Sequence, residues 1–293
     1  MELRVLKYFL AVAREQSISA AADALHLSQP TLSRQLKELE EELGKPLLIR
    51  GARQITLTEE GMILRKRAEE ILSLADKAVE EVSQSGEDVS GNVYIGAGET
   101  DAFHYLARAI AQVQQKYPNI RFHISSGDTS DVMDDLDRGL IDFGLLFGPA
   151  NTQRFETWRL PVRDEWTVLM RRDSPLACKD KITPSDLWDK PIITNRHIRE
   201  GDFFLNWLQK SITGVNIAAT YNLLFNGAVM VEEGVGYALA LDGIINVTGD
   251  SPLCARPLDP PMDAGLGLVW KRYQRLSQPA EVFLKKLIEL YGQ

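Results

Sequence analysis

The stretch that decides the fold at the N-terminus is SISAAADALHLSQPTLSRQL, residues 17–36. Ser17 is a suitable N-cap for a short helix, and the alanines at 20–22 let a second helix cross it closely. The second helix begins near Pro30, which suits a first turn because its missing N–H would have no helical partner there. A buried seam between the helices is supplied by Leu25, Leu27, Leu32 and Leu36. The spacing therefore predicts two helices joined by a tight turn.

The outward face of the second helix is polar. A helix that enters the major groove of DNA needs donors and acceptors near its N-terminus, where Gln pairs with adenine and Ser or Thr contacts several base edges. The same helix end favours phosphate. A plain helical hairpin with a solvated polar face is the alternative. The residues that we expect to contact DNA here are Ser28, Gln29, Pro30, Thr31, Ser33 and Arg34.

A turn with two arginines follows this pair of helices. Gly51 and Gln54 bracket the turn, and the apolar residues at 55 and 57 alternate as in a strand. Arg50 and Arg53 are left to meet backbone phosphates or a minor groove. Solvated charge is the alternative for two arginines beside a turn. Next to the helical motif we favour phosphate contact.

The residues on either side make the pattern specific to one family. Over residues 1–65 the chain resembles the LysR-type transcriptional regulators almost continuously, and the resemblance implies a winged helix-turn-helix with residues 44–58 as the wing. Ile18 and Leu48 stand where the family often has Phe, and neither lies on the proposed DNA face. The segments that carry the resemblance are Leu6, Tyr8-Phe9 and 11–13 before the motif, then 39–50 (LEEELGKPLLIR) and 55–61 (ITLTEEG) after it.

Charge is distributed unevenly along the 293 residues. The formal net charge is −8, yet residues 1–58 hold eight basic against seven acidic side chains, so the acidity lies outside the DNA-binding head. A head so nearly neutral predicts modest affinity for DNA, with tight binding only when two or more heads engage one DNA molecule.

The sequence offers no sign of export, metal or cofactor. The apolar run at 5–13 is short and interrupted by Lys7, so we interpret it as a core helix and expect no membrane span. Cys178 and Cys254 are expected to be free thiols in a reducing cytoplasm. The four histidines are scattered without the spacing of metal ligands, and we predict no metal site and no cofactor.

A long helix is predicted from about Thr58 to Gln84, with Thr58 as its cap. A stripe of small and apolar residues recurs along it at steps of four and three, which is typical of a helix that buries one face against another helix. The family uses this element to pair two subunits, and packing against the chain's own effector domain is the alternative. The stripe comprises Leu64, Ala68, Ile71, Ala75, Ala78 and Val82.

From Val93 onward, strands alternate with helices. Residues 93–147 predict a βαβαβ unit with a mainly parallel sheet, and a second set of strands and helices begins near Arg163. Gly96-Ala97-Gly98 lacks the third glycine and the acidic residue of a dinucleotide site. The resemblance implies a two-lobed α/β effector domain similar to periplasmic solute-binding proteins. The expected domains are 1–58 (DNA-binding), 59–90 (linker helix and hinge) and 91–293 (effector), with lobe I at 91–161 and 267–293 and lobe II at 162–266.

Ligands of such domains bind where the carboxyl ends of strands and the N-termini of helices face a shared cleft. Thr100 and Thr129 coincide with hydroxyl positions that often hold effectors in relatives. Arg196, His197 and Arg199 favour a small anion, whereas Glu99, Asp101 and Asp128 would repel an anion or bind an amine. The predicted effector-binding residues are Thr100, Thr129, Phe147, Thr194, Asn195, Arg196, Phe225 and Asn226.

Three classes of function were compared on these residues. No catalytic grouping, nucleophile elbow or P-loop supports an enzyme. A solute-binding protein would not need the DNA-binding head. We therefore predict a regulator of transcription that binds double-stranded operator DNA and a small-molecule effector, and that works as a homodimer or homotetramer.

Overall fold

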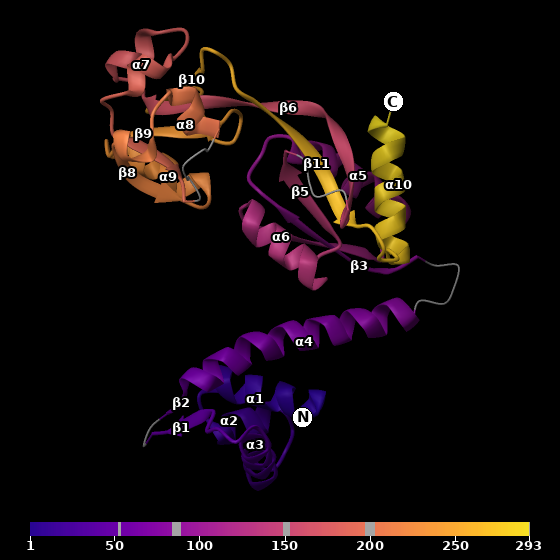
Figure 1. Cartoon of the computed structure of the whole chain (residues 1–293). Helices are drawn as coiled ribbons and strands as arrows, with labels where there is room; N and C mark the ends of the chain where they lie inside the picture. Colours follow the sequence, from indigo (N-terminus) through magenta and orange to yellow (C-terminus); the bar gives the residue numbers. More distant parts are fainter. Residues whose placement is uncertain (52–53, 84–88, 149–152, 197–202, 293) are drawn as a thin grey trace. The chain divides into compact units, whose positions relative to one another are not determined.

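The chain divides into two units, Met1–Ser85 and Gly86–Gln293, in a computed structural model (Figure 1). The structure describes residues 1–51, 54–83, 89–148, 153–196 and 203–292. Among the helices of these ranges, none is both long and apolar enough to cross a membrane.

Three helices around one apolar core form the start of the N-terminal unit. They are α1 (Leu3–Glu15), α2 (Ile18–Ala24) and α3 (Gln29–Leu43). The predicted cap at Ser17 is confirmed, since its Oγ accepts from the N–H of Ala20, and Ser28 caps α3 in the same way by accepting from the N–H of Thr31. The helix α3 ends at Gly44, whose φ of +66° favours glycine. The largest buried side chains of this core are Phe9, Leu32 and Leu36.

A two-stranded antiparallel hairpin follows α3, as predicted for the wing. It joins β1 (Leu48–Arg50) to β2 (Ile55–Leu57). One carboxylate oxygen of Glu40 accepts from the backbone N–H groups of Leu47 (2.7 Å) and Leu48 (3.1 Å), which ties the hairpin to α3. The position of the wing is therefore set by α3.

The long helix α4 (Glu59–Ser83) follows, with its N-terminus capped by Thr58, whose hydroxyl accepts from the N–H of Gly61 at 2.9 Å. A Cβ at Gly61 would lie 2.2 Å from the carbonyl oxygen of Leu47, so glycine permits the close approach of α4 to the wing.

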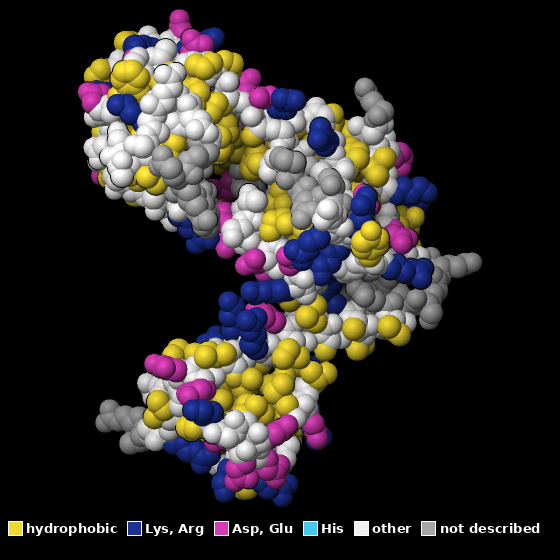
Figure 2. Space-filling view, in the orientation of Figure 1, with side chains coloured by type: hydrophobic (Ala, Val, Ile, Leu, Met, Phe, Trp, Pro, Cys, Tyr) yellow, Lys and Arg dark blue, Asp and Glu magenta, His cyan; other side chains and the backbone are white. Residues whose placement is uncertain are grey.

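The stripe on α4 differs from the expectation. Its first members, Leu64, Ala68 and Ile71, pack with Leu6 and Leu10 of α1 in the same head. They are therefore covered within the chain, whereas Val82 at the far end of the stripe is 87% exposed. The reason is that α1 is long enough to cover only the first turns of α4. Other apolar side chains remain on the surface of α4 (Figure 2), namely Met62, Ile63, Leu74 and Val79.

Lobe I of the C-terminal unit has the predicted βαβαβ order. It runs from β3 to β5 through α5 and α6, and β3 pairs in parallel with both β4 and β5. The closing helix α10 (Gln278–Tyr291) packs beside α5 over one face of the sheet, while α6 contributes to the core on the other face. The elements are β3 (Gly91–Ala97), α5 (Phe103–Lys116), β4 (Ile120–Ser126), α6 (Thr129–Arg138) and β5 (Phe143–Phe147).

Lobe II repeats this arrangement with β7 at its centre, paired in parallel with β8 and β9. Three short elements (two 3-10 turns and the four-residue helix) and the strand β10 were not predicted, because they lack a clear periodic pattern. The elements are η1 (Pro175–Cys178), α7 (Pro184–Leu187), β7 (Ile192–Asn195), α8 (Phe203–Leu208), η2 (Ile212–Gly214), β8 (Ile217–Tyr221), α9 (Leu224–Glu232), β9 (Tyr237–Leu241) and β10 (Leu253–Pro257).

Two long antiparallel strands join the lobes, β6 (Phe155–Arg171) and β11 (Asp263–Lys271) (Figure 1). The sequence predicts a strand only around Trp166 to Met170 here, with the chain crossing between the lobes near Pro161 to Arg163. The structure accommodates Pro161 because the register of β6 against β11 shifts opposite Gly265 and Gly267, where the regular ladder is interrupted.

A large-to-small change in the head core tests this packing. Leu36→Ala removes a side chain that is 1% exposed, so we expect it to destabilise the head by about 2 to 5 kcal/mol. Leu43→Ala in the same helix is the control, because Leu43 is 41% exposed and its truncation should change stability by less than about 1 kcal/mol. Calorimetry of the full chain measures both, and equal effects of the two variants would contradict the described core.

Candidate functional site

The N-terminal end of α3 presents the polar side chains that were expected to contact DNA. Ser28, Gln29, Pro30 and Arg34 are exposed, and Thr31 and Ser33 are half-buried. The apolar side of the same helix is fixed in the core by Leu32 and Leu36, so the orientation of the polar side is set by packing. This face offers hydroxyl, amide and guanidinium groups for base edges and phosphates.

Several of these side chains already have partners. The hydroxyls of Ser28 and Thr31 lie 2.7 Å apart and share a hydrogen bond. Glu38 lies 3.7 Å from the Nε of Arg34 and accepts a 2.6 Å hydrogen bond from the side-chain amide of Gln35. The contact of Arg34 with Glu38 is long and exposed, so Arg34 keeps guanidinium N–H groups that can donate to a phosphate or a base edge.

The wing supplies one described arginine. Arg50 ends β1 opposite Ile55 and is exposed. Gly51 donates its N–H to the carbonyl of Gln54 at 3.1 Å, which closes the turn. Arg53, the other predicted contact, lies outside the described residues.

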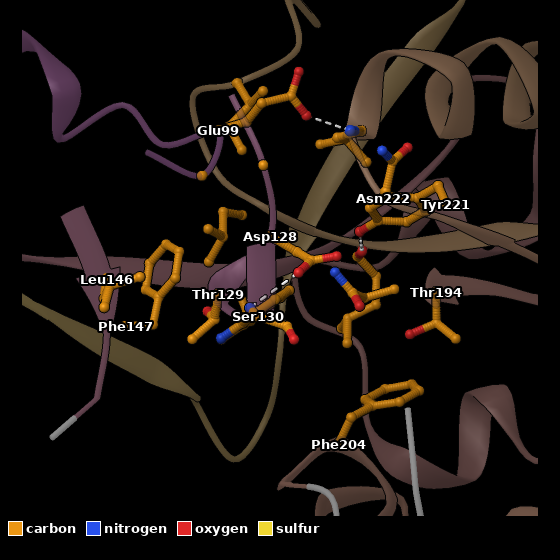
Figure 3. Close-up of a pocket in the computed structure, with 18 of the residues that line it drawn as sticks. Glu99, Asp128, Thr129, Ser130, Leu146, Phe147, Thr194, Phe204, Tyr221 and Asn222 are labelled. Carbon is orange, nitrogen blue, oxygen red and sulfur yellow. Dashed lines mark hydrogen bonds between the residues drawn. The ribbon is translucent and has the colours of Figure 1, made fainter. Parts of the chain in front are cut away.

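A cavity of about 550 Å³ lies between the two lobes of the C-terminal unit (Figures 2 and 3). The carboxyl ends of strands from both lobes meet here, and the helices α6 and α9 begin beside it. Parallel strands direct their carboxyl ends toward one edge of a sheet, which explains why polar segments far apart in the chain reach one site.

The polar lining consists of hydroxyls, amides and carboxylates. Thr129 and Ser130 come from the first turn of α6, and Thr194 is 3% exposed at the end of β7. Neighbouring polar groups are Glu99, Asp128, Asn195 and Asn222. These groups can fix the orientation of a small molecule through hydrogen bonds.

Most of the wall is apolar and rich in aromatic rings. Trp166 and Phe203 lie with their ring centroids 5.2 Å apart. Such a wall suits a ligand with a planar or otherwise apolar body. The apolar lining is Met133, Leu145, Leu146, Phe147, Trp166, Phe203, Phe204, Tyr221, Leu224, Leu239, Leu241 and Ile244.

Arg196 joins the lobes beside the cavity. Its guanidinium donates to Asp128 (Nε to Oδ2, 2.8 Å) and to Asp131 (Nη2 to Oδ2, 2.8 Å), both at the start of α6. The carboxylate of Asp128 also accepts from the N–H groups of Ser130 and Asp131 as the N-cap of α6 (Figure 3). These carboxylates raise the pKa of Arg196, so its charge is fixed and already matched.

Glu99 makes a second contact across the cavity. Its carboxylate accepts from the backbone N–H of Leu224 at the start of α9 (Figure 3). The residue before α9, Leu223, provides no side-chain cap, so a carboxylate from lobe I caps a helix of lobe II. Closure of the lobes is thus coupled to the satisfaction of a helix end.

A buried carboxylate lies where lobe I meets the crossing strand β6. The hydroxyl of Thr100 donates to Asp164, which is 6% exposed. Burial raises the pKa of Asp164, the hydrogen bond from Thr100 opposes that shift, and the charges of Asp101 and Asp242 add to it.

Two family models match the chain, one for each of its two structural units. The model of the "LysR substrate binding domain" matches residues 86–291, and that of the "bacterial regulatory helix-turn-helix protein, lysR family" matches residues 3–62. The chain belongs to the LysR family of transcriptional regulators. As a LysR family member it is a DNA-binding regulator with an effector domain, and it is not an enzyme.

Individual relatives agree with this assignment. The regulator BsdA of Bacillus subtilis (strain 168) is 41% identical over 201 residues, 68% of each chain. BudR of Raoultella terrigena is 27% identical over 289 residues, 97% of this chain and 99% of its own. CbnR in complex with its target DNA has the same fold, with a TM-score of 0.73 at 18% identity over 99% of both chains.

The cavity of this LysR regulator brings together only part of the residues predicted to bind an effector. Thr129, Phe147, Thr194 and Asn195 line it. The other four do not, and the reasons differ. Thr100 turns to Asp164, and Arg196 pairs with Asp128 and Asp131 at its edge. Phe225 is 67% exposed and Asn226 is also exposed, because α9 begins one residue earlier and turns both side chains away.

Several cavity residues were missed by sequence reasoning. Tyr221 and Asn222 end β8, and Trp166, Phe203 and Phe204 come from segments that read as core strand or helix. Large aromatic side chains give no local signal that separates a cavity wall from a packed core. Within the described ranges, no group of three or more His, Cys, Asp or Glu side chains is placed to hold a metal ion, and Cys178 and Cys254 are free.

The contact that Arg196 makes between the lobes can be tested by measuring a second contact between them, at Leu224. Arg196→Met removes the ion pairs to α6, so we expect the lobes to open more often and the Leu224 N–H to lose its Glu99 acceptor. Amide hydrogen exchange at Leu224 should become at least about fivefold faster, since the variant leaves the buried carboxylate of Asp128 without its cation. Arg154→Met, which breaks an ion pair with Asp137 inside lobe I, is the matched control. Unchanged exchange at Leu224 would show that Arg196 does not hold the lobes.

The buried carboxylate predicts a pH dependence. Because the folded state raises the pKa of Asp164, its ionised form disfavours folding, and this penalty is absent at pH values below the ordinary Asp pKa of about 4. Asp164→Asn should therefore raise the melting temperature of the C-terminal unit at pH 7, with a gain that shrinks toward pH 4. Asp180→Asn, at an exposed site, should show no such trend. A loss of stability at pH 7 would contradict the stated direction.

Proposed function

We propose that the exposed N-terminal face of α3 reads operator DNA, with Ser28, Gln29, Pro30, Thr31, Ser33 and Arg34 as its contacts. The observation that carries this proposal is that the two sides of α3 differ. Its apolar side is fixed in the head core, and its polar side stays accessible to solvent. Arg50 and Arg53 of the wing contact the phosphate backbone or a minor groove. The near-neutral charge of residues 1–58 means that these specific contacts contribute most of the discrimination.

The cavity between the lobes holds the effector. Thr129, Thr194 and Asn195 orient the ligand through hydrogen bonds, and Phe147 packs against its apolar part. Arg196 acts at the edge, where it holds lobe II to α6. The expected small anion rested on Arg196, His197 and Arg199. The first is matched by two carboxylates, and the other two lie outside the described residues.

Effector binding changes how the lobes are held together. Both Glu99 and Arg196 span the cavity, so a ligand that enters it competes with these contacts or adds to them. The response is then a shift between closed and open lobes, and its size is limited by the difference in ligand affinity for the two states.

Assembly follows from the surface of α4. Apolar side chains that α1 leaves uncovered, Ile63, Leu74 and Val82 among them, suit a helix of a second copy. A homodimer places two heads on one operator, and a homotetramer places four. We assign 1–58 to DNA binding, 59–90 to the linker and 91–293 to the effector domain, and we place the protein's action on DNA in the cytoplasm.

One substitution tests the DNA face. Arg34→Ala should weaken binding to the DNA upstream of the protein's own gene by about 5- to 100-fold, which is the range for losing a good base contact. Fluorescence anisotropy at fixed salt measures this affinity against scrambled DNA, whose weaker binding should change little.

Arg275→Ala is the control for this substitution, since it removes an exposed charge from the C-terminal unit. Equal loss on both DNAs would make Arg34 a phosphate contact without a role in specificity. No loss on either DNA would remove Arg34 from the interface.

A further inference from the structure

The described lining of the cavity is negatively charged. It contains the carboxylates of Glu99 and Asp128 and, among the described residues, no Lys, Arg or His side chain. Arg196 at the edge is shared between Asp128 and Asp131, so these three groups together still carry one negative charge.

Further acidic groups lie behind Glu99. Asp164 is buried beside Thr100, and the charges of Asp101 and Asp242 act on it. The charge of Glu99 is felt at the Tyr221 ring, where it adds to burial in raising the pKa of that phenol. Burial is the main cause of both upward pKa shifts, and the charges of Asp101, Asp242 and Glu99 add to it in the same direction.

Aromatic rings surround the same space. Phe147 of lobe I and Trp166, Phe204 and Tyr221 of the opposite wall all line it. The face of an aromatic ring attracts a cation and disfavours an anion. The ring faces and the carboxylates therefore select for the same sign of charge.

We infer that the effector is a cation, a small molecule with an aromatic or similarly planar apolar body and a protonated amine that pairs with Glu99. This inference rests on the proposed effector site and names its ligand class. Glu99 has the capacity for this role, because a carboxylate accepts about four hydrogen bonds and Leu224 uses one of them. The amine then adds its charge to a contact that already joins the lobes.

A carboxylate effector fits this cavity poorly. The guanidinium of Arg196 already binds the carboxylates of Asp128 and Asp131, so an incoming carboxylate would be the third anion on one cation. It would also lie close to both acids, and like charges repel.

The test compares ligands that share a ring and differ in charge. Titration calorimetry of the full-length protein uses 2-phenylethylamine, phenylacetate and the neutral 2-phenylethanol. We expect the amine to bind at least about tenfold more tightly than the other two. This comparison needs no variant and so does not depend on the folding of a mutant.

Glu99→Gln identifies the partner of the amine. It keeps a hydrogen-bond acceptor for Leu224 and removes the charge, so the Kd for 2-phenylethylamine should rise at least about tenfold, or about 1.4 kcal/mol. Binding of 2-phenylethanol should not change. Asp180→Asn, an exposed acid outside the lining, should leave all three affinities as in the wild type.

Three results would overturn the inference: tighter binding of phenylacetate, amine binding that survives Glu99→Gln, or no binding of any probe at roughly 10 mM. Failure of the proposed site is separable from failure of the ligand class. Phenylacetate binding that is abolished by the cavity-filling Thr129→Trp would retain the effector site and reject the amine. Amine binding unaffected by Thr129→Trp would place it elsewhere.

Discussion

The antiparallel pairing of β6 with β11 is the constraint on which the effector domain depends. The strand β6 pairs with β11 on one side and with β9 and β10 of lobe II, while β11 pairs with β5 of lobe I, so the two strands make one continuous sheet of both lobes. The parallel strands on either side then turn their carboxyl ends toward one cavity. The register shift opposite Gly265 and Gly267 interrupts the ladder at the point where the chain passes between lobes. Relative movement of the lobes is therefore confined to a short, irregular part of two strands.

The side chains that make polar contacts across the cavity belong to segments that are also part of the structure of one lobe. Asp128 caps α6 and also binds Arg196, and Glu99 follows β3 and also caps α9. Opening the lobes exposes a helix end or leaves a carboxylate without its cation, so the closed arrangement is favoured by several small contributions. A ligand that interacts with either contact changes the balance between the two arrangements.

The DNA-binding head works under a different restriction. With nearly equal numbers of acids and bases in residues 1–58, general attraction to phosphate is weak. Glu38 on α3 also holds Arg34 and Gln35 along the helix surface. Discrimination between sequences then depends on a few polar side chains, and affinity depends on the number of heads that bind together.

Local signals explain why so much of the fold was predictable. Helix starts at Ser17, Ser28 and Thr58 follow from capping groups that act within three residues, and the strands of lobe I follow from short apolar runs between turns. The length of β6 was missed because the partner that accommodates Pro161 is about a hundred residues away on β11.

The sequence by itself determined the head, the long helix, the order of strands and helices in lobe I, the main strands and helices of lobe II, and membership of a family of regulators. Only the tertiary structure decided that Thr100 turns to Asp164, that Arg196 is matched by two acids, and that α1 covers the first half of the α4 stripe. The physical reason is the distance along the chain over which each interaction acts. Capping and periodicity act between neighbours in the chain, whereas the charge and shape of a cavity depend on side chains brought together from both lobes.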